Sequence, residues 1–214
     1  VGGPWRSKPK NDFVSLGISC AFQNRVISGW SSSRDSEYTG PVDTVYLGAW
    51  RREDFLKIEG FDEELVRNQD DEICLRIRKL GKEVHQCKRV VSYYQPRSSL
   101  DKLAKQYFQY GFWKVAIWRK HGGFGAFRHW LLFATPYLAL VAAYFSPLAA
   151  GALLVAYVAS ALAASVSAKG TASLGVRLFS IVPGFIMQVS YFVGMQSALL
   201  GLRRIFGSER SLSR

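Results

Sequence analysis

Charged side chains are almost absent from the C-terminal part of this 214-residue sequence. Between His129 and Leu202 only Lys169 and Arg177 carry charge, and Glu209 is the only acidic residue after position 101. A surface that faces water rarely extends that far without a carboxylate. This pattern argues against a wholly soluble domain and predicts that the stretch lies in lipid.

Cysteine is scarce as well. The three residues Cys20, Cys74 and Cys87 are odd in number and have no C-x-x-C spacing, so neither a disulfide framework nor a zinc site is indicated. We expect reduced thiols. The opening Val1-Gly2-Gly3-Pro4 lacks the charged and then apolar regions of a signal peptide, and without an initial methionine we expect the chain to begin within a longer protein.

Basic residues gather just before the apolar region. The net charge of the sequence is +12. Nine Lys and Arg residues lie between Lys88 and Arg128, and Asp101 is the only acid in that stretch. Such a collar suits the anionic cytoplasmic face of a membrane. Nucleic acid is the rival partner for a basic stretch, but no known nucleic-acid-binding motif accompanies the charge, so we expect none.

Local patterns before the apolar region predict a mixture of strands and helices. The acids at the start of 70–80, the basic residues at its end and the following Gly81 are typical of a helix. An exposed loop is predicted at 31–37, strands at 42–50 and 83–94, a short helix at 51–58, and an aromatic and basic helix lying on the membrane surface at 100–120.

Three apolar stretches follow. Trp130–Phe145 and Pro147–Ser167 each approach the ~20 residues that a bilayer requires, and Leu174–Leu202 is a third candidate. Two spans from a cytoplasmic Arg128 would return Lys169 to the cytoplasm, whereas a third would place Arg203-Arg204 outside, against the positive-inside tendency. The sequence leaves two or three spans open, and the third stretch could be interfacial or re-entrant.

The run Gln69-Asp70-Asp71-Glu72 brings three carboxylates to a helix start. A carboxylate held there could accept the proton of an attacking hydroxyl, as an inverting glycosyl transfer requires. The alternative is structural, because Asp at a helix start is a common cap and acids are ordinary in a first turn.

The same region resembles family 2 glycosyltransferases. Glu59-Gly60-Phe61-Asp62-Glu63 is similar to their G-G-F-D-E turn, Gln69-Asp70-Asp71-Glu72 to their acid motif, and Arg76 and Gly81 fit the L-x-x-R-x-x-x-x-G that follows. Glu59 and Gln69 depart from the pattern. The segments at 42–52 and 93–97 are similar to the exopolysaccharide, succinoglycan-type branch. The resemblance implies that Asp70 is the catalytic base and that Asp71 and Glu72 support it or bind acceptor hydroxyls.

A second motif lies in the aromatic helix. Membrane synthases of this family carry a Q-x-x-R-W motif that lines the acceptor end of the site. A similar run here is Gln106-Tyr107-Phe108-Gln109-Tyr110, with Gln109 in place of the Arg and Tyr110 in place of the Trp. The resemblance implies that Gln106 and Trp113 hold the acceptor. The alternative is a surface helix whose aromatic residues anchor it at the lipid boundary.

No Asp-x-Asp occurs in the sequence. In the family this motif binds a divalent metal, Mg or Mn, that bridges the donor diphosphate, so we expect the metal ligands and the donor-binding N-terminal half to lie outside this chain, which alone would be inactive. A histidine often found after the strand that follows the helix is also missing.

The expected fold is therefore α/β. It comprises the C-terminal half of a GT-A domain (1–97), a basic interfacial region (98–128), a transmembrane region (129–207) and a polar tail (208–214). The implied function is inverting transfer of a sugar from a nucleotide donor to a lipid-linked or polysaccharide acceptor, at the cytoplasmic face of the inner membrane. A truncated or split chain that acts only with a partner, or a membrane scaffold, is the alternative.

Overall fold

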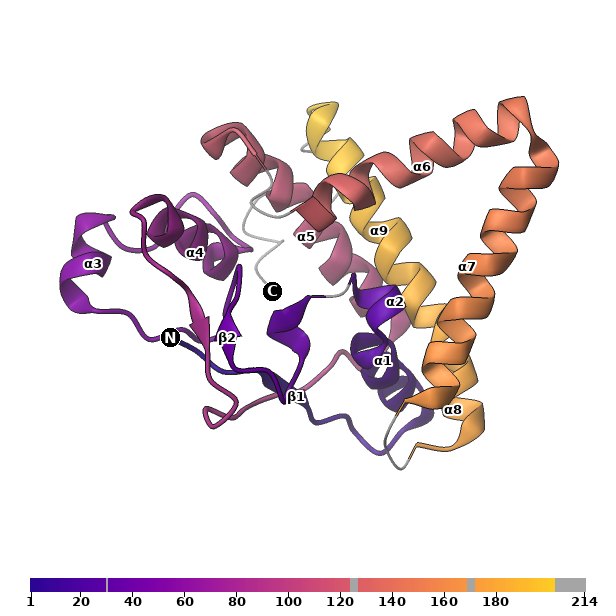
Figure 1. The fold of residues 1–214 in the computed structure, drawn as a ribbon, viewed down its shortest axis with the longest axis horizontal. Helices are drawn as coiled ribbons and strands as arrows, with labels where there is room; N and C mark the ends of the chain where they lie inside the picture. Colours follow the sequence, from indigo (N-terminus) through magenta and orange to yellow (C-terminus); the bar gives the residue numbers. More distant parts are fainter. Residues whose placement is uncertain (30, 124–126, 169–171, 203–214) are drawn as a thin grey trace.

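The computed structural model describes residues 1–29, 31–123, 127–168 and 172–202. This part of the chain is mostly helical, and its strands are short (Figure 1). Lys169, Arg203-Arg204 and the predicted polar tail at 208–214 lie outside the described residues, so the membrane topology that depends on them stays a prediction.

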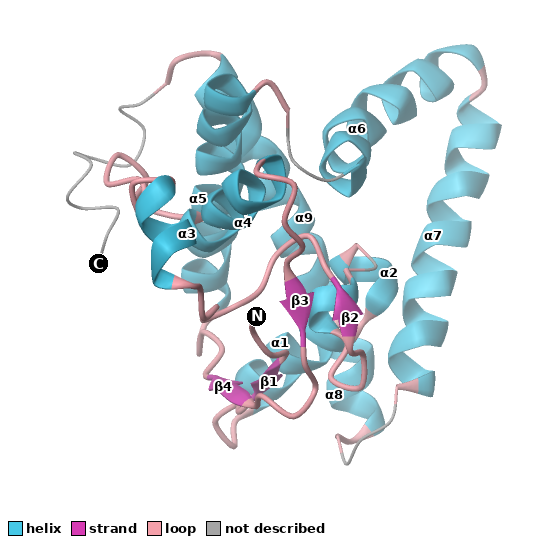
Figure 2. Ribbon diagram, turned by 60° about the vertical axis from the view of Figure 1, so that its left-hand side comes forward, coloured by secondary structure: helices cyan, strands magenta, loops and turns pink. Residues whose placement is uncertain are grey.

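The strands form two small sheets. β1 (Trp5–Ser7) pairs in parallel with β4 (Ser92–Tyr94), and β2 (Gly40–Pro41) pairs antiparallel with β3 (His85–Gln86) (Figure 2). The sequence predicts one strand at 83–94, but the chain turns in between and its two ends join different sheets. The predicted α/β class therefore holds only coarsely, because helices dominate the described chain.

The predicted strand at 42–50 is wrong. Tyr46 forms a single bridge with Gly3, and the backbone N–H of Val42 donates to the Val84 carbonyl at 2.9 Å, so the segment runs extended with isolated contacts. Leu47 has a φ of 50°, in the left-handed region that strands do not use. β-branched and aromatic composition suggested a strand here, but this backbone turn interrupts it.

Two helices near the N-terminus were not predicted. Asp12 caps α1 (Phe13–Gln23), because its Oδ1 accepts from the Ser15 N–H at 2.8 Å. Asn24 ends α1 and caps α2 (Arg25–Ser28) by accepting from two backbone N–H groups. A 3₁₀ turn, η1 (Ser32–Arg34), lies in the predicted loop.

The helices around the acid run match their predictions closely. α3 (Arg52–Lys57) and α4 (Gln69–Lys79) agree with the predicted 51–58 and 70–80 to within two residues. α4 buries the apolar side of its helix against the extended segments on either side of it. The buried members of this core are Val42, Val45, Ile73, Cys74, Ile77 and Val84.

α5 (Leu100–His121) and α9 (Ile181–Leu199) form the main helix pair and run side by side in the same direction (Figure 1). Their backbones touch at two glycines. A Cβ on Gly111 would lie 2.0 Å from the Tyr191 carbonyl oxygen, and one on Gly194 would lie 2.1 Å from that of Phe108. The predicted helix is confirmed, but no residue of α5 from Gln106 to Trp118 is exposed, so only the ends of this helix could lie on a membrane surface.

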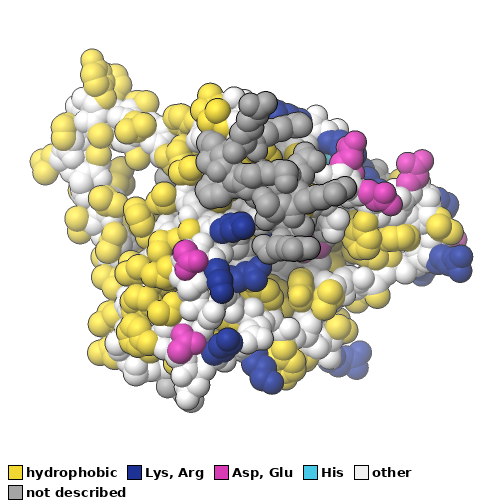
Figure 3. All heavy atoms as spheres, turned by 180° about the vertical axis from the view of Figure 1, so that it is seen from behind, with side chains coloured by type: hydrophobic (Ala, Val, Ile, Leu, Met, Phe, Trp, Pro, Cys, Tyr) yellow, Lys and Arg dark blue, Asp and Glu magenta, His cyan; other side chains and the backbone are white. Residues whose placement is uncertain are grey.

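α6 (Phe127–Phe145) and α7 (Pro147–Ser167) make an open hairpin whose corner projects from the rest of the molecule, while the C-terminal end of α7 packs against α2 and the short α8 (Leu174–Phe179) (Figure 1). Hydrophobic side chains gather over this side of the surface (Figure 3). α8 then leads into α9.

Two segments among the described residues are long and apolar enough to cross a membrane: α7, with a mean hydropathy of 2.0, and Leu174–Leu199, with 1.6. The apolar part of α6, His129–Phe145, is shorter. The first predicted span is thus a helix but is short for a bilayer. The second and third predicted spans are long and apolar enough to cross one. These helices favour association with a membrane.

Candidate active site

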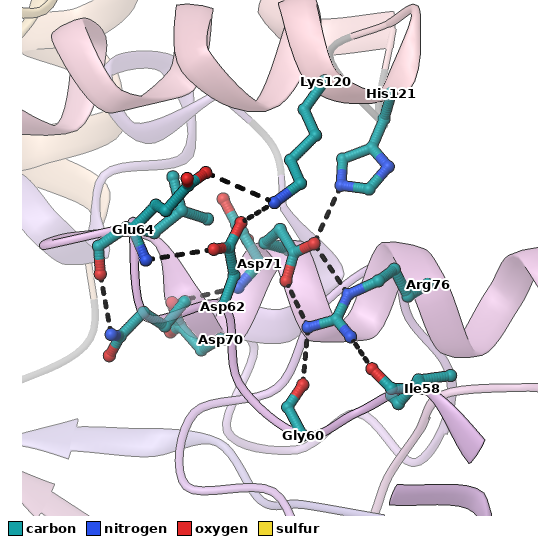
Figure 4. Close-up of polar contacts among 12 residues, drawn as sticks. Ile58, Gly60, Asp62, Glu64, Asp70, Asp71, Arg76, Lys120 and His121 are labelled. Carbon is teal, nitrogen blue, oxygen red and sulfur yellow. Dashed lines mark hydrogen bonds and ion pairs between the residues drawn. The ribbon is translucent and has the colours of Figure 1, made fainter. Parts of the chain in front are cut away.

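The turn before α4 is held in place by Arg76. Glu59 and Gly60 both have left-handed backbone angles, with φ of 60° and 73°, and Arg76 donates to the carbonyls of Ile58 and Gly60 (Figure 4). A guanidinium that satisfies two carbonyls fixes such a turn, because its donors form a rigid fork. The glycosyltransferase-like turn and helix are therefore one structural unit.

Glu72 completes this clamp and lies outside the cavity described below. Its side chain is fully buried, and both of its carboxylate oxygens accept from Arg76 at 2.7 Å. Glu72 Oε1 is also 2.8 Å from His121 Nε2 at the end of α5. The predicted supporting role of Glu72 toward an acceptor does not fit this position, because both oxygens already have partners away from the cavity.

Asp70 is not the cap of α4. Asn68 occupies the cap position with a left-handed φ of 61°, and its side-chain amide donates to the Tyr110 carbonyl at 2.9 Å. Asp70 is the second residue of the helix, where its Oδ1 accepts from the Asp71 N–H at 3.0 Å. The capping explanation of this carboxylate is therefore wrong, whereas its place in the first turn of α4, where acids are ordinary, agrees with the other part of the structural alternative.

Asp71 points toward α5 and forms an ion pair there. The Lys114 Nζ lies 2.7 Å from Asp71 Oδ2, and the lysine side chain is only 5% exposed. Burial on its own would raise the pKa of Asp71, but the ammonium of Lys114 holds that pKa well below its usual range. Asp71 is thus an anion that is already paired.

Asp70 has the opposite electrostatic environment. Removal from bulk water and the adjacent negative charge of Asp71 raise the pKa of Asp70 to about 6. Its side chain stays open to a cavity while protein surrounds it, which explains how it is both exposed and poorly solvated. Two neighbouring carboxylates with opposite shifts are typical of sites in which one of them exchanges a proton.

Both carboxylates line a cavity of about 250 Å³ between the N-terminal segments and helices α5, α6 and α9. Many of its walls are aromatic. The lining residues on which the site depends include Trp5, Arg34, Tyr94, Gln106, Tyr107, Tyr110, His129 and Tyr191. The predicted boundaries at 97 and 128 therefore do not separate the site from the apolar helices, because one cavity draws on all of them.

Gln106 lies in this cavity wall, as the resemblance implies. Its Nε2 donates to the hydroxyls of Tyr94 and Tyr110, both at 2.8 Å. These contacts place the second motif beside the first: Tyr110, whose backbone carbonyl binds Asn68, is four residues after Gln106 on the same helix face.

Trp113 does not reach the cavity. It is 8% exposed and packs with Leu65 and Ile117 in a small core between α4 and α5. The predicted role of Trp113 in holding an acceptor therefore does not fit its position. A tryptophan at a helix surface and one in a helix core look alike in the sequence, because α5 has apolar residues on most of its faces.

Several lining residues escaped the sequence analysis. Tyr110 lies four residues after the predicted Gln106, and this spacing on one helix face was an available signal. His129 and Tyr191 were not recognisable, because α6 and α9 reach the cavity only through tertiary packing. The His129 Nδ1 and the Tyr191 hydroxyl lie 3.1 Å apart across those two helices.

No group of three or more His, Cys, Asp or Glu among residues 1–29, 31–123, 127–168 and 172–202 is placed to hold a metal ion. The acids of the site do not form one either, since Asp71 is committed to Lys114 and Glu72 to Arg76. The residues described here therefore do not fit a resident metal.

The chain matches no protein-family model and no solved structure. It is 28% identical over 166 residues to the succinoglycan biosynthesis protein ExoA of Rhizobium meliloti (strain 1021). The match covers 72% of this chain and 47% of that protein, so the chain spans about half the length of the curated relative. This modest similarity agrees with the branch suggested by the motifs at 42–52, 69–72 and 93–97.

Proposed function

We propose that this chain forms the acceptor side of an inverting glycosyltransferase site at a membrane, in the biosynthesis of an exopolysaccharide. Asp70 is the general base that takes the proton from the acceptor hydroxyl. The observation that carries the proposal is the position of Asp70: an open carboxylate with a raised pKa, beside a paired one, in a cavity that the Gln106–Tyr110 motif also lines.

The chemistry of the cavity supports a sugar ligand. Aromatic side chains give flat apolar faces on which sugar rings stack, while hydroxyl and amide groups supply hydrogen bonds. The relative named above is a protein of succinoglycan biosynthesis, which supports a polysaccharide pathway. A general base whose pKa lies near the working pH is efficient, because it is ionised at pH 7 yet still binds a proton strongly.

The neighbouring apolar helices support an acceptor that is lipid-linked or a growing polysaccharide at the membrane surface. α6 and α9 contribute to the cavity wall through Leu132 and Met187. We further propose that the site faces the cytoplasm, where the basic collar meets anionic lipid. A nucleotide sugar donor and its Mg or Mn ion would be held by residues outside this chain.

The test is Asp70→Asn in the complete protein. Loss of a general base should lower kcat by on the order of 10²–10⁴-fold while the KM for the nucleotide sugar changes little. Asp101→Asn is the matched control, because Asp101 is also exposed and is also the second residue of its helix. Retention of most turnover by Asp70→Asn would contradict the proposal.

The raised pKa gives two further expectations. The rate should increase with pH through about 6, so that activity at pH 5 is roughly a tenth of the plateau. Because the pKa of Asp70 is raised from 3.8 to about 6 in the folded state, ionisation of Asp70 lowers the stability as the pH rises from about 4 to about 6, and the full cost is present above that range. Asp70→Asn should therefore increase the free energy of unfolding at pH 7.5, by about 1 kcal/mol after allowance for solvent screening. Thermal denaturation at pH 5 and pH 7.5 measures this, and a loss of stability at pH 7.5 would be the contrary result.

A further inference from the structure

Lys114 is a charged residue in the interior of the protein. It lies in the middle of α5 and is 4% exposed, on the face that packs against α4. Enclosing a lysine and a carboxylate is costly even when they pair, and apolar residues of similar size often stabilise a protein as well or better. Stability alone is therefore a weak reason for this ion pair.

The groups that face the pair come from three helices. Asp70 adjoins Asp71 on α4, Tyr110 lies one turn before Lys114 on α5, and His129 comes from α6. Lys114 is the cation in hydrogen-bond contact with Asp71, at 2.7 Å. Its charge is the strongest of the influences that lower the pKa of Asp71, and His129 and a hydrogen bond from Thr44 act in the same direction.

We propose that Lys114 is a positioning residue that keeps Asp71 ionised and paired, so that Asp70 alone accepts the substrate proton. The proposal rests on the function proposed above. With Asp71 held as an anion, Asp70 is the stronger base of the two and the one that is open to the cavity. The ion pair also joins the first turn of α4 to α5 and so fixes the direction of Asp70.

The proton balance is simple. As the acceptor oxygen bonds to the sugar carbon, its proton passes to the Asp70 carboxylate, and the donor phosphate leaves with the electron pair of the broken bond. Lys114 and Asp71 exchange no proton during this step. Their role is electrostatic and geometric, which makes the pH profile the informative measurement.

The experiment is the pH profile of kcat for Lys114→Met in the complete protein. Without its main counter-ion, Asp71 should bind a proton more readily, which weakens the neighbouring negative charge that raises the pKa of Asp70. Loss of the Lys114 charge acts on Asp70 in the opposite direction but is the smaller of the two effects. The acidic limb of the profile should move down by about one pH unit or more, with a plateau rate lower by on the order of tenfold. Lys114→Arg keeps the charge and should leave the limb in place.

Two further variants separate this role from a structural one. Lys105→Met makes the same change at an exposed position of α5 and should not move the limb. The double variant Lys114→Met with Asp71→Asn leaves no unpaired charge, so it should fold even where the single variant does not, and it should show the same lowered limb.

The outcomes also separate this inference from the proposed function. A strong loss of kcat in Asp70→Asn together with an unmoved limb in both Lys114→Met and the double variant overturns the role of Lys114 alone. A loss of stability in Lys114→Met without a shift of the acidic limb of its pH profile would also overturn the role of Lys114 alone. Full turnover in Asp70→Asn overturns the proposed function, and the role of Lys114 with it.

Discussion

α7 and α9 are both long apolar helices, yet their surroundings differ. Of the most apolar window of each candidate span, 11% is buried in α7 and 39% in the segment that ends with α9. Leu148 and Val155 of α7 are 87% and 68% exposed, whereas Met187 and Met195 of α9 are almost completely buried, in cores to which α1, α2 and α5 contribute. Hydropathy alone does not distinguish a helix that needs lipid on nearly all sides from one whose apolar face is already covered by protein.

The largest expected effect is on the exposed helix. Leu154→Lys places a charge near the middle of α7, where Leu154 is 62% exposed. A lysine at the centre of a lipid-inserted helix costs about 3 kcal/mol. The fraction that resists carbonate extraction from membranes should fall sharply, whereas Leu154→Met should leave it unchanged. An unchanged membrane fraction for Leu154→Lys would show that α7 is not surrounded by lipid.

A smaller effect is expected at the helix crossing. Gly194→Ala would push a methyl group against the α5 backbone at Phe108 and should lower the free energy of unfolding by about 1–3 kcal/mol. Gly151→Ala makes the same change in α7 with nothing within 4 Å, and should be neutral or stabilising by about 0.5–1 kcal/mol. Thermal denaturation in detergent compares them. Equal effects at the two glycines would erase the distinction between the helices.

The smallest effect concerns a bond between the two helices. The Tyr157 hydroxyl of α7 donates to Gln188 Oε1 of α9 at 2.7 Å. Tyr157→Phe should lower the free energy of unfolding by about 1 kcal/mol, because it removes one hydrogen bond and little else. Tyr144→Phe, at a position 84% exposed, is the control and should have no effect. A larger loss in the control would mean that the hairpin has contacts beyond those described.

Local signals predicted the parts of the fold that depend on nearby residues. The acids, basic residues and glycine around α4 lie within a dozen positions, and the structure confirms that helix, whose first turn lines the cavity. α1 was missed although Asp12 and Ser15 form a recognisable cap. The prediction of a strand at 42–50 was wrong because Leu47 has a left-handed backbone conformation, which a leucine in a sequence does not indicate.

The candidate site was harder to predict where it depends on long-range contacts. Asp70, Asp71 and Gln106 line the cavity, whereas Glu72 and Trp113 face other partners. The pairing of Asp71 with Lys114 joins residues 43 positions apart, and nothing in the local pattern specifies it. Motifs indicate which residue types are present, while packing decides which of them face the cavity.

The passage of α5 along α9 bears on how this protein can be dissected. Membrane enzymes are commonly shortened before their first apolar helix to obtain a soluble catalytic part. Here a chain cut before α6 would lose the partner of α5 over its whole length, together with the cavity wall formed by Met187, Gln188 and Tyr191. The shortened product would expose the contact surface around Gly111 to water and should aggregate. Soluble material is better sought by replacing the outward residues of α7, such as Leu148 and Val155, while α9 is kept.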